Sequence, residues 1–303
     1  MNRLESPGPG GPEQSIYEAL AIWAERTPGA VAIVTPGRPH LTCSSLRAQI
    51  ERTVGALRAM GLKREDRVAA VLPNGSELAV AVPTIAAGAT YAPLNPAYGS
   101  REFHFYLSDL EAKALLLQAG LDSPARAVAK ELGIPTLDVS PVPGAAAGVF
   151  SLEGEQQSRA TQHDFAQPGK VALVLHTLGT TSRPEMVPLM HANLLASARN
   201  IRAAYALSPA DRCLNVMPLF HIHGLGAAIL STLVSGASVV CTSGSDASRF
   251  FDWLVAFCST WYTALPTMHH AILKQAEAQS EAIAGYPLRT IFEAPPSQLC
   301  YGL

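Results

Sequence analysis

Apolar residues follow two alternating patterns along this chain. Short continuous runs of aliphatic and β-branched residues alternate with longer segments in which apolar residues return every three or four positions. The short runs predict buried strands, and the longer segments predict amphipathic helices. We expect strands at residues 67–72, 91–94, 114–117, 171–176, 213–217, 238–241 and 261–264.

The helical segments carry start and stop signals. Ser15 and Glu18 have capping-box spacing ahead of the first helix, and Gly61 ends the second. Pro83 lies inside a third and would kink it. We expect helices starting at residue 16 and near residue 46, and at residues 75–89, 101–110, 124–132, 192–205, 225–234, 250–257 and 268–278.

Strands that alternate with helices indicate an α/β fold of stacked, mostly parallel sheets with helices on both faces. The periodicity disappears over residues 140–169, where Pro, Gly, Ala, Gln and Ser dominate. We therefore expect a flexible N-terminus at 1–14, a first α/β subdomain at 15–139, a linker at 140–169 and a second α/β subdomain at 170–303.

Composition supports a globular protein. Of 303 residues, 48% are hydrophobic and 15% are charged, so the chain can bury a large core. The formal net charge of −2 gives no electrostatic reason to expect a nucleic-acid partner. Five scattered Cys without a C-x-x-C pair, and an N-terminus without an apolar signal region, predict reduced thiols and a cytoplasmic location.

One apolar stretch could be mistaken for a membrane span. Residues 213–245 contain no Asp, Glu, Lys or Arg, and 225–241 are strongly apolar. Gly236, however, divides this stretch into a helical segment and a β-run, each too short to cross a bilayer. We therefore expect no integral membrane segment.

A loop rich in hydroxyl groups follows the strand at 171–176. Small residues let backbone N–H groups and hydroxyls surround a phosphate, and we expect a helix near His191 to follow. The Walker spacing is absent, and an ordinary strand-to-helix connection with hydroxyl caps is the alternative. The candidate phosphate-binding residues are Thr177, Gly179, Thr180, Thr181 and Ser182.

Two further segments follow predicted strands. Residues 217–225 place Phe220 and His221 where a strand ends and a helix begins, a common ligand position in open α/β sheets. A histidine here is also often just a packed polar residue, and the neighbouring histidines lack the carboxylates or thiols of a metal site. Residues 260–268 form a strand that ends in the turn Pro266, Thr267 and Met268.

These three segments, in this order, resemble the AMP-forming acyl-CoA synthetases and related adenylate-forming enzymes. The resemblance is strongest to the oxalate- and fatty-acid-CoA ligase-like branch, whose loop reads H-T-S-G-T-T-S-R-P-K. Residues 71–75, 88–89 and 91–96 resemble the amino-terminal part of that family. The resemblance covers nearly the whole chain and implies the stacked sheets of the amino-terminal domain of these enzymes.

The resemblance also implies a two-step reaction. A carboxylic acid attacks the α-phosphorus of ATP, with Mg²⁺ present, to give an acyl-adenylate, and the thiol of CoA then displaces AMP. By position, residues 177 and 179–182 would hold phosphates, and Arg183 would support the loop. Phe220 and His221 would shape the carboxylate and acyl site, with His221 as the candidate catalytic residue. Pro266, Thr267 and Met268 would lie near the acyl group, and no residue is singled out as a metal ligand.

The chain departs from the family pattern at Leu178, which stands for a Ser, and at Glu185, which stands for a Lys. A unit charge about 5 Å from a phosphate is worth roughly 3 kcal/mol at an effective dielectric near 20, so Glu185 would disfavour phosphate. The later family motifs that hold Mg²⁺ and ribose, and the catalytic Lys domain, are not in this sequence. We expect a truncated ligase with reduced or no full activity. The alternative is a non-catalytic remnant that binds nucleotide or acyl groups.

Overall fold

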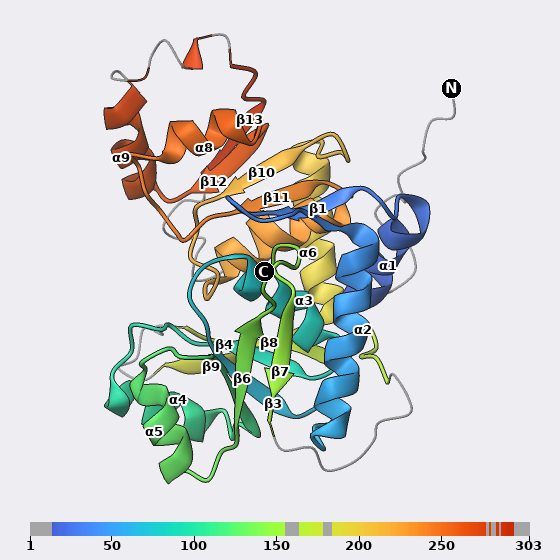
Figure 1. Cartoon of the computed structure of the whole chain (residues 1–303), viewed down its shortest axis with the longest axis vertical. Coiled ribbons are helices and arrows are strands. Elements are labelled where there is room, and N and C mark those ends of the chain that lie inside the picture. Colours follow the sequence, from blue (N-terminus) through green and yellow to red (C-terminus); the bar gives the residue numbers. More distant parts are fainter. Residues whose placement is uncertain are drawn as a thin grey trace.

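The computed structural model describes residues 14–154, 164–177, 184–276, 279, 283–284 and 286–293. Two β-sheets are stacked, with one layer of helices between them and further helices on their outer faces (Figure 1). Most neighbouring strands are parallel, and the antiparallel pairs lie at sheet edges. The predicted α/β fold of stacked, mostly parallel sheets is confirmed.

The seven-stranded sheet has the order β7-β6-β5-β3-β4-β8-β9. Alternate residues of its central strands face opposite layers, so that Val68 and Ala70 of β3 join the core between the sheets, and Ala69 and Val71 join the outer core. Its strands are β3 (Arg67–Val71), β4 (Thr90–Pro93), β5 (Ala114–Gln118), β6 (Thr136–Pro141), β7 (Phe150–Glu153), β8 (Val171–Thr177) and β9 (Glu185–Met190).

The six-stranded sheet has the order β13-β12-β10-β11-β1-β2. Its central strands are short and fully buried, as expected of parallel strands that are covered on both faces. Its strands are β1 (Val31–Val34), β2 (Leu41–Thr42), β10 (Arg212–Asn215), β11 (Ser238–Cys241), β12 (Trp261–Ala264) and β13 (Thr290–Glu293).

The helices divide into three layers according to the core that they bury. The layer between the sheets contains α1 (Ile16–Arg26), α2 (Cys43–Ala59), α3 (Ser76–Ala86), α6 (His191–Ala204), η1 (His223–Leu230) and α7 (Ser231–Val234). The outer face of the seven-stranded sheet is covered by α4 (Ser100–Asp109) and α5 (Pro124–Glu131). The outer face of the six-stranded sheet is covered by α8 (Phe250–Ala256) and α9 (Pro266–Ala276). The predicted capping box at Ser15 and Glu18 is present at α1.

The uncharged stretch from residue 223 to 241 is a buried helix followed by β11. Its first half, η1, is a π-helix rather than the predicted α-helix, and the N–H of Ser231 donates to the carbonyl of Gly226 five residues earlier. Hydroxyls of Thr232 and Ser235 donate to carbonyls four residues earlier, so these buried groups are satisfied inside the helix. Within the described ranges, no helix is both long enough and apolar enough to cross a bilayer.

Sheet membership does not follow the predicted boundary at residues 140–169. The predicted first subdomain contains β1 and β2, which belong to the six-stranded sheet, and the predicted second one contains β8 and β9, which belong to the seven-stranded sheet. The predicted linker contains β7, which pairs antiparallel with β6. The predicted linker therefore includes a strand of the seven-stranded sheet, and the division into two subdomains stays a prediction.

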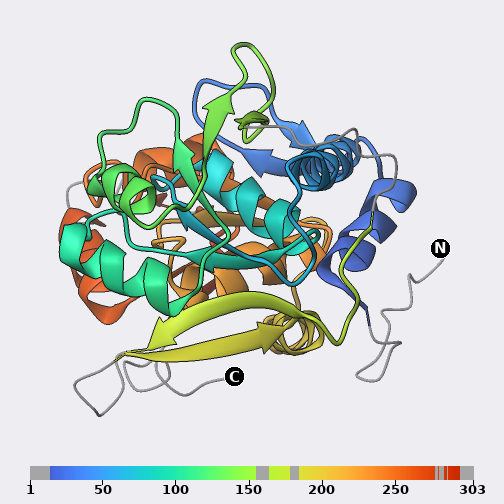
Figure 2. The same cartoon turned by 90° about the horizontal axis from the view of Figure 1, so that it is seen from below.

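The segment after residue 183 differs from the prediction. The sequence predicted a strand, a loop and then a helix, but the structure places β9 between the loop and α6 (Figure 2). β8 and β9 form an antiparallel hairpin with Thr177 opposite Glu185. β9 therefore separates α6 from the candidate loop, so the N-terminus of α6 does not directly follow that loop as the sequence predicted.

Candidate functional site

Two of the predicted site segments leave the same edge of the six-stranded sheet. β10 and β12 are parallel neighbours, with Asn215 opposite Thr263. The carboxyl ends of parallel strands meet at one edge, where ligands bind in open α/β sheets. The connection that carries Phe220 and His221 follows β10, and the turn that starts at Pro266 follows β12. The fold therefore places these two predicted segments side by side.

The Phe220–His221 pair lies on a tightly folded connection. The centroids of the two rings are 4.4 Å apart, and the N–H of His221 donates to the carbonyl of Pro218 at 3.4 Å. Gly224 lies against the same carbonyl, since a Cβ there would be 2.5 Å from the Pro218 oxygen. A glycine is therefore required for this connection to fold back onto η1.

His221 is the exposed member of this pair, and Phe220 is half-buried. Surrounding protein atoms nevertheless remove enough water from the imidazole to lower its pKa from the ordinary value near 6.5. The ring is therefore predominantly neutral at pH 7. A neutral imidazole can donate one hydrogen bond and accept another, which suits the positioning of a carboxylate.

Two further histidines lie near His221, of which the sequence analysis considered His223 only as a metal ligand and did not single out His269. His223 is buried at the start of η1 and its Nε2 pairs with the hydroxyl of Thr263 in β12. Burial, together with the charges of His269 and His221, lowers the pKa of His223 to about 4. His269 pairs through Nδ1 with the hydroxyl of Tyr262 at 3.1 Å. His223 lies two residues from His221, and His269 follows Met268. This closeness in sequence to predicted site residues was the signal that could have pointed to both.

The turn after β12 begins α9 directly. Pro266 occupies the first helical position, where its missing N–H costs nothing. Thr267 is exposed. Met268 is half-buried and packs against the core beneath α8 and α9. Its side chain therefore has a packing role in addition to its predicted position near the acyl group.

The candidate phosphate loop joins β8 to β9. Thr177 is the last residue of β8 and is half-buried, whereas Glu185 opposite it is exposed. Cross-strand partners project from the same face of a hairpin, so the Glu185 carboxylate and the Thr177 hydroxyl share one face. Outside the described residues lie Leu178, Gly179, Thr180, Thr181, Ser182 and Arg183.

The end of β8 is anchored through His176. Its Nε2 pairs with a carboxylate oxygen of Asp109 at 3.0 Å, and its ring packs edge-on against Tyr106 with centroids 4.7 Å apart. Both partners lie on α4, which covers the outer face of the sheet. The start of the candidate loop is therefore fixed to a packed helix.

The carboxyl edges of the two sheets approach each other. Asn74 follows β3 in the seven-stranded sheet, and its side chain bonds to backbone atoms of Met217 and Leu219, which follow β10 in the six-stranded sheet. β3, β4 and β8 are consecutive parallel strands, so Thr177 ends at the same sheet edge as Asn74. Thr177 at the end of β8 and the Phe220–His221 pair therefore lie on facing edges.

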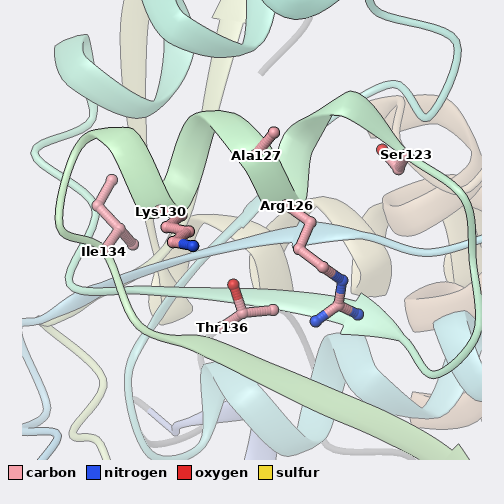
Figure 3. A pocket seen from close by; sticks show the side chains of 6 residues that line it. All are labelled: Ser123, Arg126, Ala127, Lys130, Ile134 and Thr136. Carbon is pink, nitrogen blue, oxygen red and sulfur yellow. The ribbon is translucent and has the colours of Figure 1, made fainter.

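A surface pocket of about 600 Å³ lies elsewhere, between α5 and the start of β6 (Figure 3). Arg126 points from the helix toward the strand that carries Thr136, and it forms an ion pair with Asp138. None of the residues that line this pocket is a predicted site residue. They are Ser123, Arg126, Ala127, Lys130, Ile134 and Thr136.

Comparison with known proteins identifies a family and curated relatives that this chain resembles. A family model described as "AMP-binding enzyme" matches residues 20–299. The chain is 39% identical over 265 residues to a "Probable CoA ligase CCL9" of Humulus lupulus, covering 85% of this chain and 49% of that protein. It is 37% identical over 263 residues to an oxalate–CoA ligase of Arabidopsis thaliana, covering 85% of this chain and 51% of that protein.

A solved structure supports the fold. ATP-bound MatB from Rhodopseudomonas palustris superposes with a TM-score of 0.74 at 24% identity, over 91% of this chain and 54% of that one. The chain thus spans about half the length of the curated relatives it matches.

Proposed function

The chain belongs to the AMP-binding enzyme family, and from that premise we propose that it binds ATP with Mg²⁺ and activates a small carboxylic acid for transfer to CoA. A carboxylate oxygen attacks the α-phosphorus, the bond to the β-phosphate oxygen breaks, and pyrophosphate leaves. The sulfur of CoA then attacks the acyl carbon of the adenylate, and AMP leaves as the thiol gives up its proton.

One observation carries this proposal. The segment that resembles a phosphate loop follows β8, the Phe220–His221 pair follows β10, and the Asn74 contacts bring the edges of the two sheets together. A triphosphate held at the first edge can thus present its α-phosphorus to an acid held at the second. Adenylation depends mainly on such positioning and on charge compensation.

The nucleotide side of the proposed site consists of Thr177 and residues 179–183. Hydroxyls and backbone N–H groups would hold the β- and γ-phosphates, and Arg183 would add a positive charge. Within the described ranges, no three His, Cys, Asp or Glu side chains cluster as metal ligands. In this proposal Mg²⁺ enters with ATP as part of the substrate.

The acid side consists of Phe220, His221 and the turn Pro266–Met268. His221 would donate a hydrogen bond to the substrate carboxylate and hold it toward the nucleotide. Because the pKa of His221 is lowered, the ring would do so without a full positive charge, which leaves the carboxylate a better nucleophile. The Arabidopsis relative named an oxalate–CoA ligase favours a small dicarboxylic acid as the substrate class.

Acid-dependent exchange of labelled pyrophosphate into ATP tests the proposed adenylation. We expect exchange with oxalate or another small dicarboxylic acid, and none without acid. His221→Ala should lower the exchange rate roughly 100-fold, the usual contribution of a group that positions or transfers a proton, while leaving the Kd for ATP unchanged.

The outcomes separate the possible functions. ATP binding without exchange for any acid would assign the chain to nucleotide binding without adenylation. The absence of both ATP binding and pyrophosphate exchange would refute the proposed function. Equal exchange by the wild type and His221→Ala would remove His221 from the acid site while leaving adenylation in place.

A further inference from the structure

The carboxamide of Asn74 joins the two sheets beside the candidate acid site. Asn74 lies in the connection between α3 and β3, and β3 belongs to the seven-stranded sheet. Its Oδ1 accepts from the N–H of Leu219 at 2.9 Å, and its Nδ2 donates to the carbonyl of Met217 at 3.3 Å. Both ends of the side chain therefore bind the backbone of the connection that carries the Phe220–His221 pair.

The same connection is held from its own sheet by a second carboxamide. Asn215 ends β10 and is fully buried. Its Nδ2 donates to the Met217 carbonyl at 3.2 Å, and its Oδ1 accepts from the Met217 N–H at 3.3 Å. The Met217 carbonyl thus accepts from two carboxamides, one from each sheet, which uses both of its lone pairs.

The residues after Met217 leave few backbone groups for other tethers. Pro218 has no N–H, and its carbonyl accepts from the N–H of His221. The Leu219 side chain is fully buried, and the Leu219 N–H is the donor that Asn74 accepts. From the side of the seven-stranded sheet, Asn74 therefore contributes two hydrogen bonds to residues 217–219, one to Met217 and one to Leu219.

We propose that Asn74 is a positioning residue for the reaction: it fixes the backbone of residues 217–219 against the seven-stranded sheet and so sets where Phe220 and His221 lie relative to Thr177 at the end of β8. The catalytic meaning of this placement rests on the proposed function. The tether itself is a property of this chain and can be measured without any activity.

Two substitutions separate the two hydrogen bonds. Asn74→Ala removes both of them. Asn74→Asp has nearly the same shape and keeps the acceptor for the Leu219 N–H, but it places a carboxylate oxygen against the Met217 carbonyl. The matched control is Asn95, which follows β4 in the same sheet and whose Oδ1 accepts only the local N–H of Ala97 at 2.9 Å. Asn95→Ala and Asn95→Asp repeat the same changes there.

The measurement is NMR of the chain, reading amide exchange at Leu219 and the imidazole signals of His221. We expect Asn74→Ala to speed Leu219 exchange about tenfold, and Asn74→Asp to leave it near the wild-type rate. Both variants should shift the His221 signals, and Asn74→Ala should move its titration midpoint toward the ordinary histidine value. The signals of buried His191, and both readouts in the Asn95 variants, should stay unchanged.

Unchanged His221 signals in both Asn74 variants would overturn the proposal, even if Leu219 exchange accelerates, because the tether would then not position the pair. If Asn74→Ala fails to fold, the comparison of Asn74→Asp with Asn95→Asp still decides. Where the wild type supports pyrophosphate exchange, the Asn74 variants should lower kcat and leave the KM for ATP unchanged. If the wild type shows no pyrophosphate exchange, that result would count against the proposed function but not against the positioning of the Phe220–His221 pair by Asn74.

Discussion

At the scale of single residues, His191 shows how burial fixes a protonation state. Its side chain is fully buried at the start of α6, and its Nδ1 accepts from the N–H of Ile16 at 3.2 Å. That bond requires an unprotonated Nδ1, so the ring is neutral and carries its proton on Nε2. Burial lowers the pKa of His191 to about 4. The ring thereby ties α1 to α6 only while it stays uncharged.

This state makes stability depend on pH. The unfolded chain has a histidine pKa near 6.5, so between pH 6.5 and 4 it binds more protons than the folded chain. The free energy of unfolding should therefore fall as the pH drops through this window, by up to about 3 kcal/mol for His191. His191→Asn keeps an acceptor for Ile16 and should show a flatter pH dependence in urea titrations at pH 4.5 and 7. Equal pH dependence in the variant and the wild type would contradict this account.

Glu185 is the other residue whose charge has a specific consequence. It is exposed and lies opposite Thr177 at the base of the candidate phosphate loop. Glu185→Lys should tighten binding of ATP with Mg²⁺ roughly fivefold, since solvent reduces the full charge effect to about 1 kcal/mol, and Glu185→Gln should lie between. The gain should shrink at high salt. Equal or weaker binding by Glu185→Lys would place the triphosphate away from this face.

At the scale of elements, helix ends offer a matched comparison. α6 and α2 end in the same motif, in which the N–H of Leu207 bonds to the carbonyl of Arg202 and that of Leu62 to Leu57. The residue in the left-handed conformation is Ala206 in α6, with φ +49°, and Gly61 in α2, with φ +81°. A residue with a Cβ is strained in this conformation, so the end of α6 is strained at Ala206, whereas the end of α2 is not strained at Gly61.

Ala206→Gly should therefore raise the free energy of unfolding by about 0.5–1 kcal/mol, and Gly61→Ala should lower it by about 1 kcal/mol. Urea midpoints at unchanged slope give both values. A loss of stability in Ala206→Gly would show that the flexibility of glycine in the unfolded chain outweighs the relief of strain.

The sequence predicted the elements that carry strong local signals and missed those defined by their partners. Gly61 and the capping box at Ser15 and Glu18 correctly marked helix ends. β9 was missed because Glu185–Met190 contains a proline and lacks strict alternation, and its strand conformation depends on pairing with β8. The π form of η1 was missed because apolar periodicity does not report whether an N–H bonds to the carbonyl four or five residues earlier.

At the scale of the whole molecule, the order of strands in the sequence does not reveal sheet membership. β1 pairs with β11 across some two hundred residues, and β8 crosses into the sheet built by β3–β7. The sequence could place Phe220, His221 and Pro266–Met268 at strand ends, and the parallel pairing of β10 with β12 makes them neighbours. It could not show that His223 pairs with Thr263 or that Asn74 binds the backbone of Met217 and Leu219, because those contacts join distant segments.

The account depends most on nucleotide binding at the loop after β8. Isothermal titration of the chain with ATP and Mg²⁺ tests it directly, comparing the wild type with a Thr180→Val, Thr181→Val double variant. We predict saturable binding at one site in the wild type and at least a tenfold weaker Kd in the variant, since two hydroxyl contacts to a charged phosphate are lost. Absence of binding in the wild type, or equal affinity in the double variant, would contradict the central claim.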